Sequence, residues 1–249
     1  VLSVIIPVFN EEATILTVLQ RVNDVVLEGV DKEIIVVDDG STDRTREILA
    51  AHAGLIQKTV LAEKNGGKGA AVKMGLAHAT GVYVLLQDAD MEYDPRDYPK
   101  LLKALTDYNA DVVMGSRTLA PEIIRVHSGA NLFGNRVLTL VFNVFFNKTF
   151  SDIYTCYLAF KRRLVDPLEL RTLGFEQQAE ILSYCVLRGH RFYEVPINYH
   201  GRDVSEGKKI KARHAFSVLW TMFWCRLNKS SIIRRAENQS LVKQEFAHE

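Results

Sequence analysis

Cysteine is scarce in this 249-residue sequence: only three are present, far apart and in hydrophobic surroundings, with no CxxC pair. No cysteine or histidine cluster has the spacing of metal ligands, so nothing indicates a zinc site. We expect buried thiols in a reducing compartment at Cys156, Cys185 and Cys225. A surplus of one charge is also lacking, because the formal net charge is only +1. A net charge this small excludes the strongly positive electrostatic potential of a protein that binds nucleic acid non-specifically.

A long uninterrupted apolar run is missing as well. No stretch reaches the roughly 20 apolar residues that spanning a bilayer requires. Residues 132–150 and 215–227 are rich in aromatic and aliphatic side chains, but Asn, Arg and Lys interrupt the first and basic residues flank the second. Such segments suit helices that lie in a membrane interface, and helices packed on the protein's own core are the alternative. Residues 1–7 lack the basic region and cleavage site of a signal peptide, so we expect a strand there.

Short β-branched runs alternate with helical patterns through the first half of the chain. This alternation predicts βαβ units and a largely parallel sheet, and the continuous apolar runs predict strands buried on both faces. The expected strands are 4–6, 33–37, 58–61, 82–86 and 111–114, and the expected helices are 11–26, 43–53, 69–79 and 95–107. In the second half we expect strands within 154–160 and 191–198 and a helix over 176–188.

The domain organisation follows from these patterns. We expect one α/β domain over residues 1–228, with an amphipathic segment of interfacial type near 132–150. Residues 229–249 are polar and irregular in pattern. They predict a C-terminal tail that is frayed or forms one short surface helix.

Two carboxylates follow one of the predicted buried strands. Asp88 and Asp90 come directly after the apolar run 82–86. Ligands of open α/β sheets bind beyond the carboxyl ends of the strands, so these side chains are expected at a site. Their hard oxygen atoms can reach one cation together and select Mg²⁺ or Mn²⁺, which bridges substrate phosphates. Glu92 is a candidate third ligand.

A second acidic pair ends another strand. Asp38 and Asp39 follow an apolar run, and a carboxylate at such a position can accept hydrogen bonds from a nucleoside. A helix-capping turn is the alternative, and we expect Asp38 to be structural and Asp39 to face the ligand. Asn10 and Ser41 stand where each would cap the following helix.

These motifs occur in the order and approximate spacing of family 2 glycosyltransferases of the GT-A fold, which the chain resembles. The first half carries SVIIPVFNEE at 3–12, VVDDGSTD at 36–43, NGGKG at 65–69, QDAD at 87–90 and GSR at 115–117. The second half carries DIYTCY at 152–157, GFEQQAE at 174–180, EVPINY at 194–199, GR at 201–202 and EGKK at 206–209. Over residues 1–227 it is most similar to the dolichyl-phosphate mannose synthase and polyprenyl-phosphate glycosyltransferase branch.

The resemblance implies a nucleotide diphosphate sugar as the donor. It implies that the nucleoside is held by Pro7, Asn10, Glu11 and Asp39. It also implies that Mg²⁺ or Mn²⁺ on the diphosphate is held by Asp88 and Asp90, with Glu92 beside them. The NGGKG run lacks the spacing and terminal Ser or Thr of a Walker loop, so we expect a tight turn with Lys68 near the donor.

For the acceptor, the resemblance implies a polyprenyl phosphate. Arg117 would face the acceptor phosphate, and Arg202 with Lys208 or Lys209 would bind the donor diphosphate or the acceptor phosphate. Arg forks match phosphate oxygens well. Asp90, Arg117 and Arg202 are thus the expected catalytic residues, the protein is expected to lie peripherally at the cytoplasmic membrane face, and a homo-oligomer is left open.

The acceptor decides whether a base is required. A phosphate monoester has a second pKa of about 6 and arrives mostly dianionic, so direct in-line attack with inversion needs no base. A hydroxyl acceptor needs one, and Glu176 or Glu180 would provide it. A nucleotide-sugar-binding protein without activity is a further alternative, which the intact carboxylates and arginines argue against. A nucleotidyltransferase is disfavoured because no glycine follows the first strand.

Overall fold

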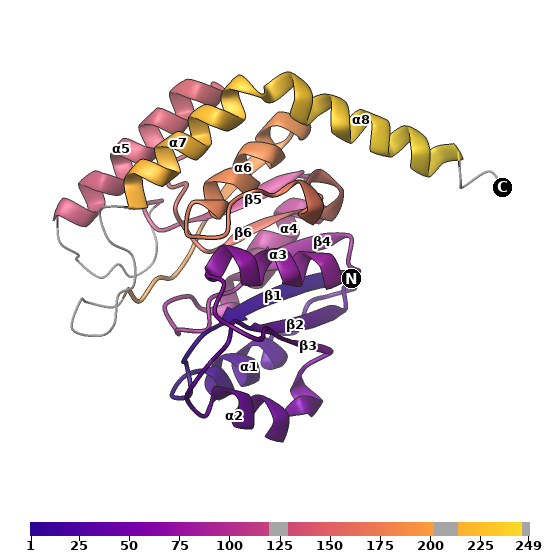
Figure 1. The fold of residues 1–249 in the computed structure, drawn as a ribbon, viewed down its shortest axis with the longest axis vertical. Helices are drawn as coiled ribbons and strands as arrows, with labels where there is room; N and C mark the ends of the chain where they lie inside the picture. The colour runs from indigo at the N-terminus through magenta and orange to yellow at the C-terminus, as the bar shows by residue number, and fades with distance from the viewer. Residues whose placement is uncertain (120–128, 202–213, 246–249) are drawn as a thin grey trace.

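A seven-stranded sheet forms the centre of the molecule, with strand order β3-β2-β1-β4-β6-β5-β7. The computed structural model describes residues 1–119, 129–201 and 214–245. Strand β6 is antiparallel to both β4 and β5, and the other neighbouring pairs are parallel. The mostly parallel α/β sheet expected from the sequence is therefore confirmed (Figure 1). The strands are β1 Leu2–Val8, β2 Lys32–Asp38, β3 Lys58–Leu61, β4 Tyr83–Leu86, β5 Val112–Ser116, β6 Leu158–Lys161 and β7 Phe192–Pro196.

Helices follow the strands where the apolar periodicity predicts them, although several begin a few residues later than expected. Figure 1 shows α5 and α7 side by side, with α8 continuing from α7 and extending away from the rest of the molecule. The helices are α1 Ile15–Asp24, α2 Thr45–Ala51, α3 Lys68–His78, α4 Tyr98–Thr106, α5 Gly129–Phe146, α6 Gln177–Arg188, α7 His214–Leu227 and α8 Lys229–Glu245.

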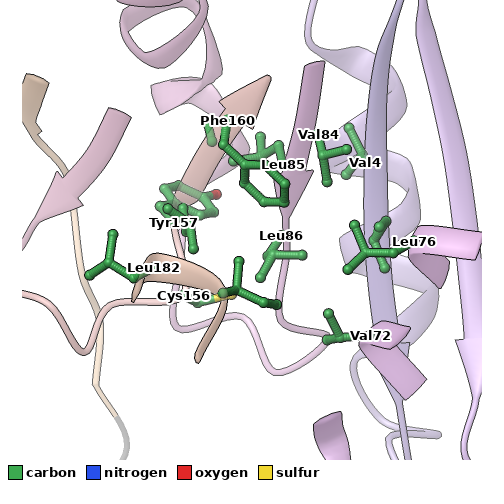
Figure 2. Close-up of a cluster of buried hydrophobic side chains, with 14 of the residues drawn as sticks. Val4, Val72, Leu76, Val84, Leu85, Leu86, Cys156, Tyr157, Phe160 and Leu182 are labelled. Atoms are coloured by element: carbon green, nitrogen blue, oxygen red, sulfur yellow. The ribbon is translucent and has the colours of Figure 1, made fainter. Parts of the chain in front are cut away.

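The core lies on both faces of the sheet, as the continuous apolar strands predict. Val4 of β1 and Val84 of β4 are fully buried, and side chains from α3 and α6 pack around the same cluster (Figure 2). Burying one such aliphatic side chain stabilises the fold by about 1.5–3 kcal/mol. The three cysteines are free and buried, as expected, and Cys156 belongs to this cluster.

Two local expectations are wrong. The segment from Lys229 onward is a helix of 17 residues rather than a frayed tail or a short helix. Ile232 of this helix is buried, and its carbonyl accepts hydrogen bonds from Arg188. These contacts hold the first part of the helix against the rest of the protein. Neither Asn10 nor Ser41 caps a helix, because α1 begins at Ile15 and α2 begins at Thr45.

In the segments 132–150 and 215–227, packing on the protein's own core is confirmed for one side of each helix. Buried side chains such as Phe142 and Met222 pack α5 and α7 against the core. The opposite sides of the same helices form an apolar outer face, where the exposed fractions are 69% for Phe133, 63% for Leu140, 70% for Val144, 77% for Phe216 and 59% for Trp220. Among the helices that the structure describes, none has the length and hydropathy needed to cross a bilayer.

Gly75 sets the distance between α3 and the sheet, which gives a test of this packing. A Cβ atom at this position would overlap Ile5 Cγ2 of β1 and lie 3.3 Å from Val37 Cγ2 of β2. Gly75→Ala is expected to lower the free energy of unfolding by about 1–3 kcal/mol, because overpacking forces the core apart. Urea unfolding measures this change.

Gly134→Ala on α5 is the matched control, since no described atom outside its own stretch of helix lies within 4 Å of its Cβ position. This control is expected to gain up to about 1 kcal/mol from helix propensity. Equal effects of the two substitutions would contradict the close packing of α3.

Candidate active site at the carboxyl ends of the strands

The loops that follow β1 and β2 are joined by polar contacts. Asn10 has a positive φ of 53°, its N–H donates to Ser41 Oγ at 3.0 Å, and its Oδ1 accepts from the Thr42 N–H at 2.8 Å. The Glu11 N–H donates to Thr45 Oγ1 at 3.0 Å. Asn10 and Ser41 thus connect two loops instead of capping two helices. Pro7, which lies within β1, leads directly into this joined region.

Asp38 and Asp39 have different partners; the structural role expected of Asp38 is confirmed, and the ligand-facing role expected of Asp39 stays a prediction. Asp38 is fully buried and accepts from the Ser41 N–H and from Arg46 Nε at 2.6 Å, so it stabilises its own turn. Asp39 accepts from the backbone N–H groups of Gly66 and Gly67, each at 2.8 Å. Burial raises the pKa of Asp39 and the neighbouring Asp38 adds to this, so its net pKa is raised although both amides lower it.

Lys68 reaches across to the first of the two predicted metal ligands. Its Nζ lies 2.6 Å from Asp88 Oδ1. Burial lowers the pKa of Lys68, but the Asp88 carboxylate raises it and the net shift is upward, so the ammonium keeps its charge. The predicted position of Lys68 in a turn is close to what is found, since Lys68 begins α3 after Gly67, whose φ is 96°.

The predicted set of three carboxylate ligands is not found. Within residues 1–119, 129–201 and 214–245, no three His, Cys, Asp or Glu side chains are gathered to hold a metal. Met91 adopts a positive φ of 65°, which turns the chain between Asp90 and Glu92. Glu92 Oε2 accepts from Tyr199 OH at 2.9 Å, and its N–H donates to Asp90 Oδ1 at 3.2 Å. Asp88 and Asp90 remain as candidate ligands, and Glu92 is directed to Tyr199.

Arg117, expected to face an acceptor phosphate, forms a forked ion pair with Asp152. Its Nε lies 2.7 Å from Asp152 Oδ2 and its Nη2 lies 2.9 Å from Oδ1, while Nη2 also donates to the Tyr154 carbonyl at 2.7 Å. The guanidinium carbon stands 5.0 Å from the centre of the Tyr199 ring. Burial alone would raise the pKa of Asp152, but the charge and hydrogen bonds of Arg117 lower it, and the net shift of the pKa is downward. Arg117 therefore orients Tyr154 and Tyr199 in addition to any role toward a ligand.

Of the two glutamates considered as a base, Glu180 is excluded by its surroundings. It is fully buried and accepts from the Arg171 N–H at 3.0 Å, from the Thr172 N–H at 2.9 Å and from Thr172 Oγ1 at 2.6 Å. These bonds hold the turn before α6. Glu176 accepts from the Gly174 N–H at 3.3 Å. Arg202, Lys208 and Lys209 lie outside the described residues.

Two members of the site, Asp152 and Tyr199, were quoted in sequence motifs but were given no role. Nothing in the sequence identifies Arg117 as the partner of Asp152, because the two residues are 35 positions apart and meet only after folding. Nothing local indicates the contact of Tyr199 with Glu92, because the two residues are 107 positions apart and become neighbours only in the fold, beside the isolated bridge between Tyr93 and Tyr199.

The ion pair of Arg117 and Asp152 gives a prediction about stability. Asp152→Asn is expected to lower the free energy of unfolding by about 3 kcal/mol at neutral pH, because a buried guanidinium loses its charge partner. Since the folded pKa of Asp152 is lowered, its contribution is present above the unfolded pKa of about 3.9 and is lost as pH falls through the folded value.

Chemical unfolding between neutral and strongly acidic pH measures the difference between variant and wild type. The exposed Asp107→Asn is the control. A difference for Asp152→Asn that stays constant with falling pH would contradict the ion pair.

The glycosyl transferase family 2 model matches residues 3–168, more than half of the chain. The chain is 34% identical over 200 residues to glycosyltransferase AglJ of Haloferax volcanii, covering 80% of this chain and 63% of that protein. It is 29% identical over 228 residues to dolichol-phosphate mannosyltransferase of Pyrococcus furiosus, covering 87% and 61%. The low-salt glycan biosynthesis hexosyltransferase Agl6 of Haloferax volcanii is 31% identical and is covered over only 48% of its length.

Among solved structures, glucosyl-3-phosphoglycerate synthase of Mycobacterium tuberculosis superposes with a TM-score of 0.66 at 22% identity, covering 90% of this chain and 79% of that one. This likeness confirms the fold expected from the sequence. The chain spans 48% and 63% of the lengths of Agl6 and AglJ, so it corresponds to part of each. From the family model and the shared motifs, we conclude that the chain belongs to glycosyl transferase family 2.

Proposed function

We propose that this chain transfers a hexose, with inversion, from a nucleotide diphosphate sugar to a polyprenyl phosphate at the cytoplasmic face of a membrane. The observation that carries the acceptor proposal is the apolar outer face of α5 and α7, which is connected to the site. Asn135 of α5 donates to Asp152 Oδ1 at 2.8 Å, and Ser217 of α7 contacts Glu176 at 3.5 Å. A lipid tail on this face would bring its phosphate to the polar site.

The donor half of the proposal rests on the loops after β1, β2 and β4. Asn10, Glu11 and Asp39 stand at the nucleoside end, and Asp88 with Asp90 stands at the diphosphate end. Two carboxylates with hard oxygens fit Mg²⁺ or Mn²⁺, which completes its ligand shell with waters and phosphate oxygens. When bound, the cation would neutralise charge on the leaving diphosphate. A solved structure of the mycobacterial synthase, which shares the fold, contains Mn²⁺ and uridine diphosphate, and this supports the proposed cation.

The acceptor half of the proposal rests on the charge of the acceptor phosphate as well as on the apolar surface of α5 and α7. A phosphate monoester has a second pKa of about 6, so it needs no base near neutral pH. The hydrogen bonds that occupy Glu180 remove one of the two bases considered for a hydroxyl acceptor, and Glu176 stays a candidate base for that alternative. Two relatives carry names that include a polyprenyl phosphate, dolichol-phosphate mannosyltransferase and an undecaprenyl-phosphate transferase of Salmonella choleraesuis. Between α5 and α7, an open apolar groove is lined by Val141, Phe145, Phe216, Leu219, Trp220 and Phe223.

The donor and the cation can be tested together. A thermal-shift screen of UDP-, GDP- and dTDP-sugars with and without Mn²⁺ is expected to show one base that stabilises the protein only when Mn²⁺ is present, because ligands that bind the native state raise its stability. Asp90→Ala is expected to lose this Mn²⁺-dependent shift and at least about a hundredfold in transfer rate. The exposed Asp31→Ala serves as the control. Metal-dependent turnover retained by Asp90→Ala would overturn the metal assignment.

Membrane contact through the apolar outer face is tested with vesicles. The triple variant Leu140→Ser, Val144→Ser, Trp220→Ser is expected to bind anionic liposomes at least about a hundredfold more weakly, because three apolar side chains no longer leave water. Co-sedimentation measures the bound fraction.

The matched control changes three exposed apolar residues elsewhere, whose exposed fractions are similar or larger: Val26 at 82%, Val82 at 62% and Leu168 at 86%. Equal binding by the two triple variants would contradict the proposed membrane face.

A further inference from the structure

The backbone that carries Lys68 is fixed on two sides. Both oxygens of Asp39 accept from the Gly66 and Gly67 amides at 2.8 Å. On the other side, the Ala70 N–H donates to the Leu173 carbonyl at 3.0 Å, and a Cβ atom at Gly69 would lie 2.6 Å from the Leu173 carbonyl carbon. Glycine is therefore required for this close approach, and the segment has little freedom to shift as a whole.

Asp88 is also held in place. The preceding Gln87 is fully buried, and its Oε1 accepts from Tyr98 OH at 2.7 Å and from Tyr157 OH at 2.8 Å. Its Nε2 donates to the Asp88 carbonyl at 2.8 Å. The elements that carry Lys68 and precede Asp88 share one buried cluster. Figure 2 labels two of its members, Val72 of α3 and Leu86 of β4.

The side chains of Lys68 and Asp88 meet between these two hydrogen-bonded backbones. The Lys68 ammonium lies 2.6 Å from Asp88 Oδ1, and the exposed fractions of the side chains are 29% and 20%. A solvated cation can therefore reach the same carboxylate. An ammonium and a divalent cation cannot both lie against one carboxylate oxygen without strong repulsion between like charges.

We propose that Lys68 competes with a divalent cation for Asp88, and that binding of the cation releases the Lys68 ammonium to the diphosphate of the donor. The inference rests on the proposed metal role of Asp88. The flexible four-carbon stem of lysine allows the ammonium to move while the glycine-rich turn stays fixed. A free ammonium is a suitable point charge for a phosphate oxygen. The donor would therefore bind most tightly after the cation has bound, because the Lys68 ammonium is then available to its diphosphate.

Mn²⁺ binding without nucleotide tests the competition. Titration followed by electron paramagnetic resonance is expected to show that Lys68→Met binds Mn²⁺ about tenfold more tightly than wild type, because one charged hydrogen bond no longer opposes binding. With Mn²⁺ present, the same variant is expected to bind UDP about tenfold more weakly. Lys68→Arg is expected to stay nearer to wild type in both titrations, since it keeps a positive charge.

Lys73→Met is the matched control on the same helix, because Lys73 Nζ donates to the Leu170 carbonyl and not to a carboxylate. It is expected to leave both affinities unchanged. Mn²⁺ binding by Lys68→Met that is equal to or weaker than wild type would overturn the competition. If Asp88→Ala binds Mn²⁺ as well as wild type does, the metal role of Asp88 itself fails.

A second measurement uses the wild-type protein and does not depend on the folding of a variant. Acylation of lysines by an amine-reactive reagent, followed by peptide mass spectrometry, reports how free each ammonium is. Lys68 is expected to react slowly alone, several times faster with Mn²⁺, and slowly again with Mn²⁺ and UDP, while Lys73 stays constant. A Lys68 rate that does not change when Mn²⁺ binds would contradict the release of its ammonium.

Discussion

The carboxylate of Asp39 organises one end of the candidate site through two backbone amides. By accepting from Gly66 and Gly67, it ties the end of β2 to the turn that begins α3. The turn sets the position of Lys68 at the beginning of α3. The Lys68 side chain then reaches Asp88, which follows β4. Three separate strand ends are thereby connected by one chain of contacts. Since β1 lies between β2 and β4 in the sheet, the contacts cross over the end of β1.

A second set of contacts stabilises the other end of the site. The ion pair of Arg117 and Asp152 joins the end of β5 to the chain that follows α5, and Arg117 also lies against the ring of Tyr199. Tyr199 donates to Glu92, whose N–H donates to Asp90. A charge that the sequence assigned to ligand binding thus has a structural partner as well. Buried ion pairs are costly to break on one side, which explains why a single change here affects both stability and site geometry.

The two helices that carry the apolar outer face, α5 and α7, also contact residues of the site. Asn135 lies on α5 and contacts Asp152, while Ser217 lies on α7 and contacts Glu176. Helices that bury one side and expose apolar side chains on the other fit an interfacial location. The sequence shows the amphipathic pattern of these two helices, and the tertiary structure shows that both of them contact the site.

The sequence by itself determined the order of strands and helices, the mostly parallel sheet and the acidic residues at the strand ends, because apolar periodicity and strand-end chemistry are local properties. Only the tertiary structure decided which partner each polar side chain has. Glu92 lies near Asp90 in sequence but bonds Tyr199, and Glu180 holds a turn instead of acting as a base. Such choices depend on residues that are distant in sequence and adjacent only after folding, since a buried polar group must find a partner in the space that packing leaves to it.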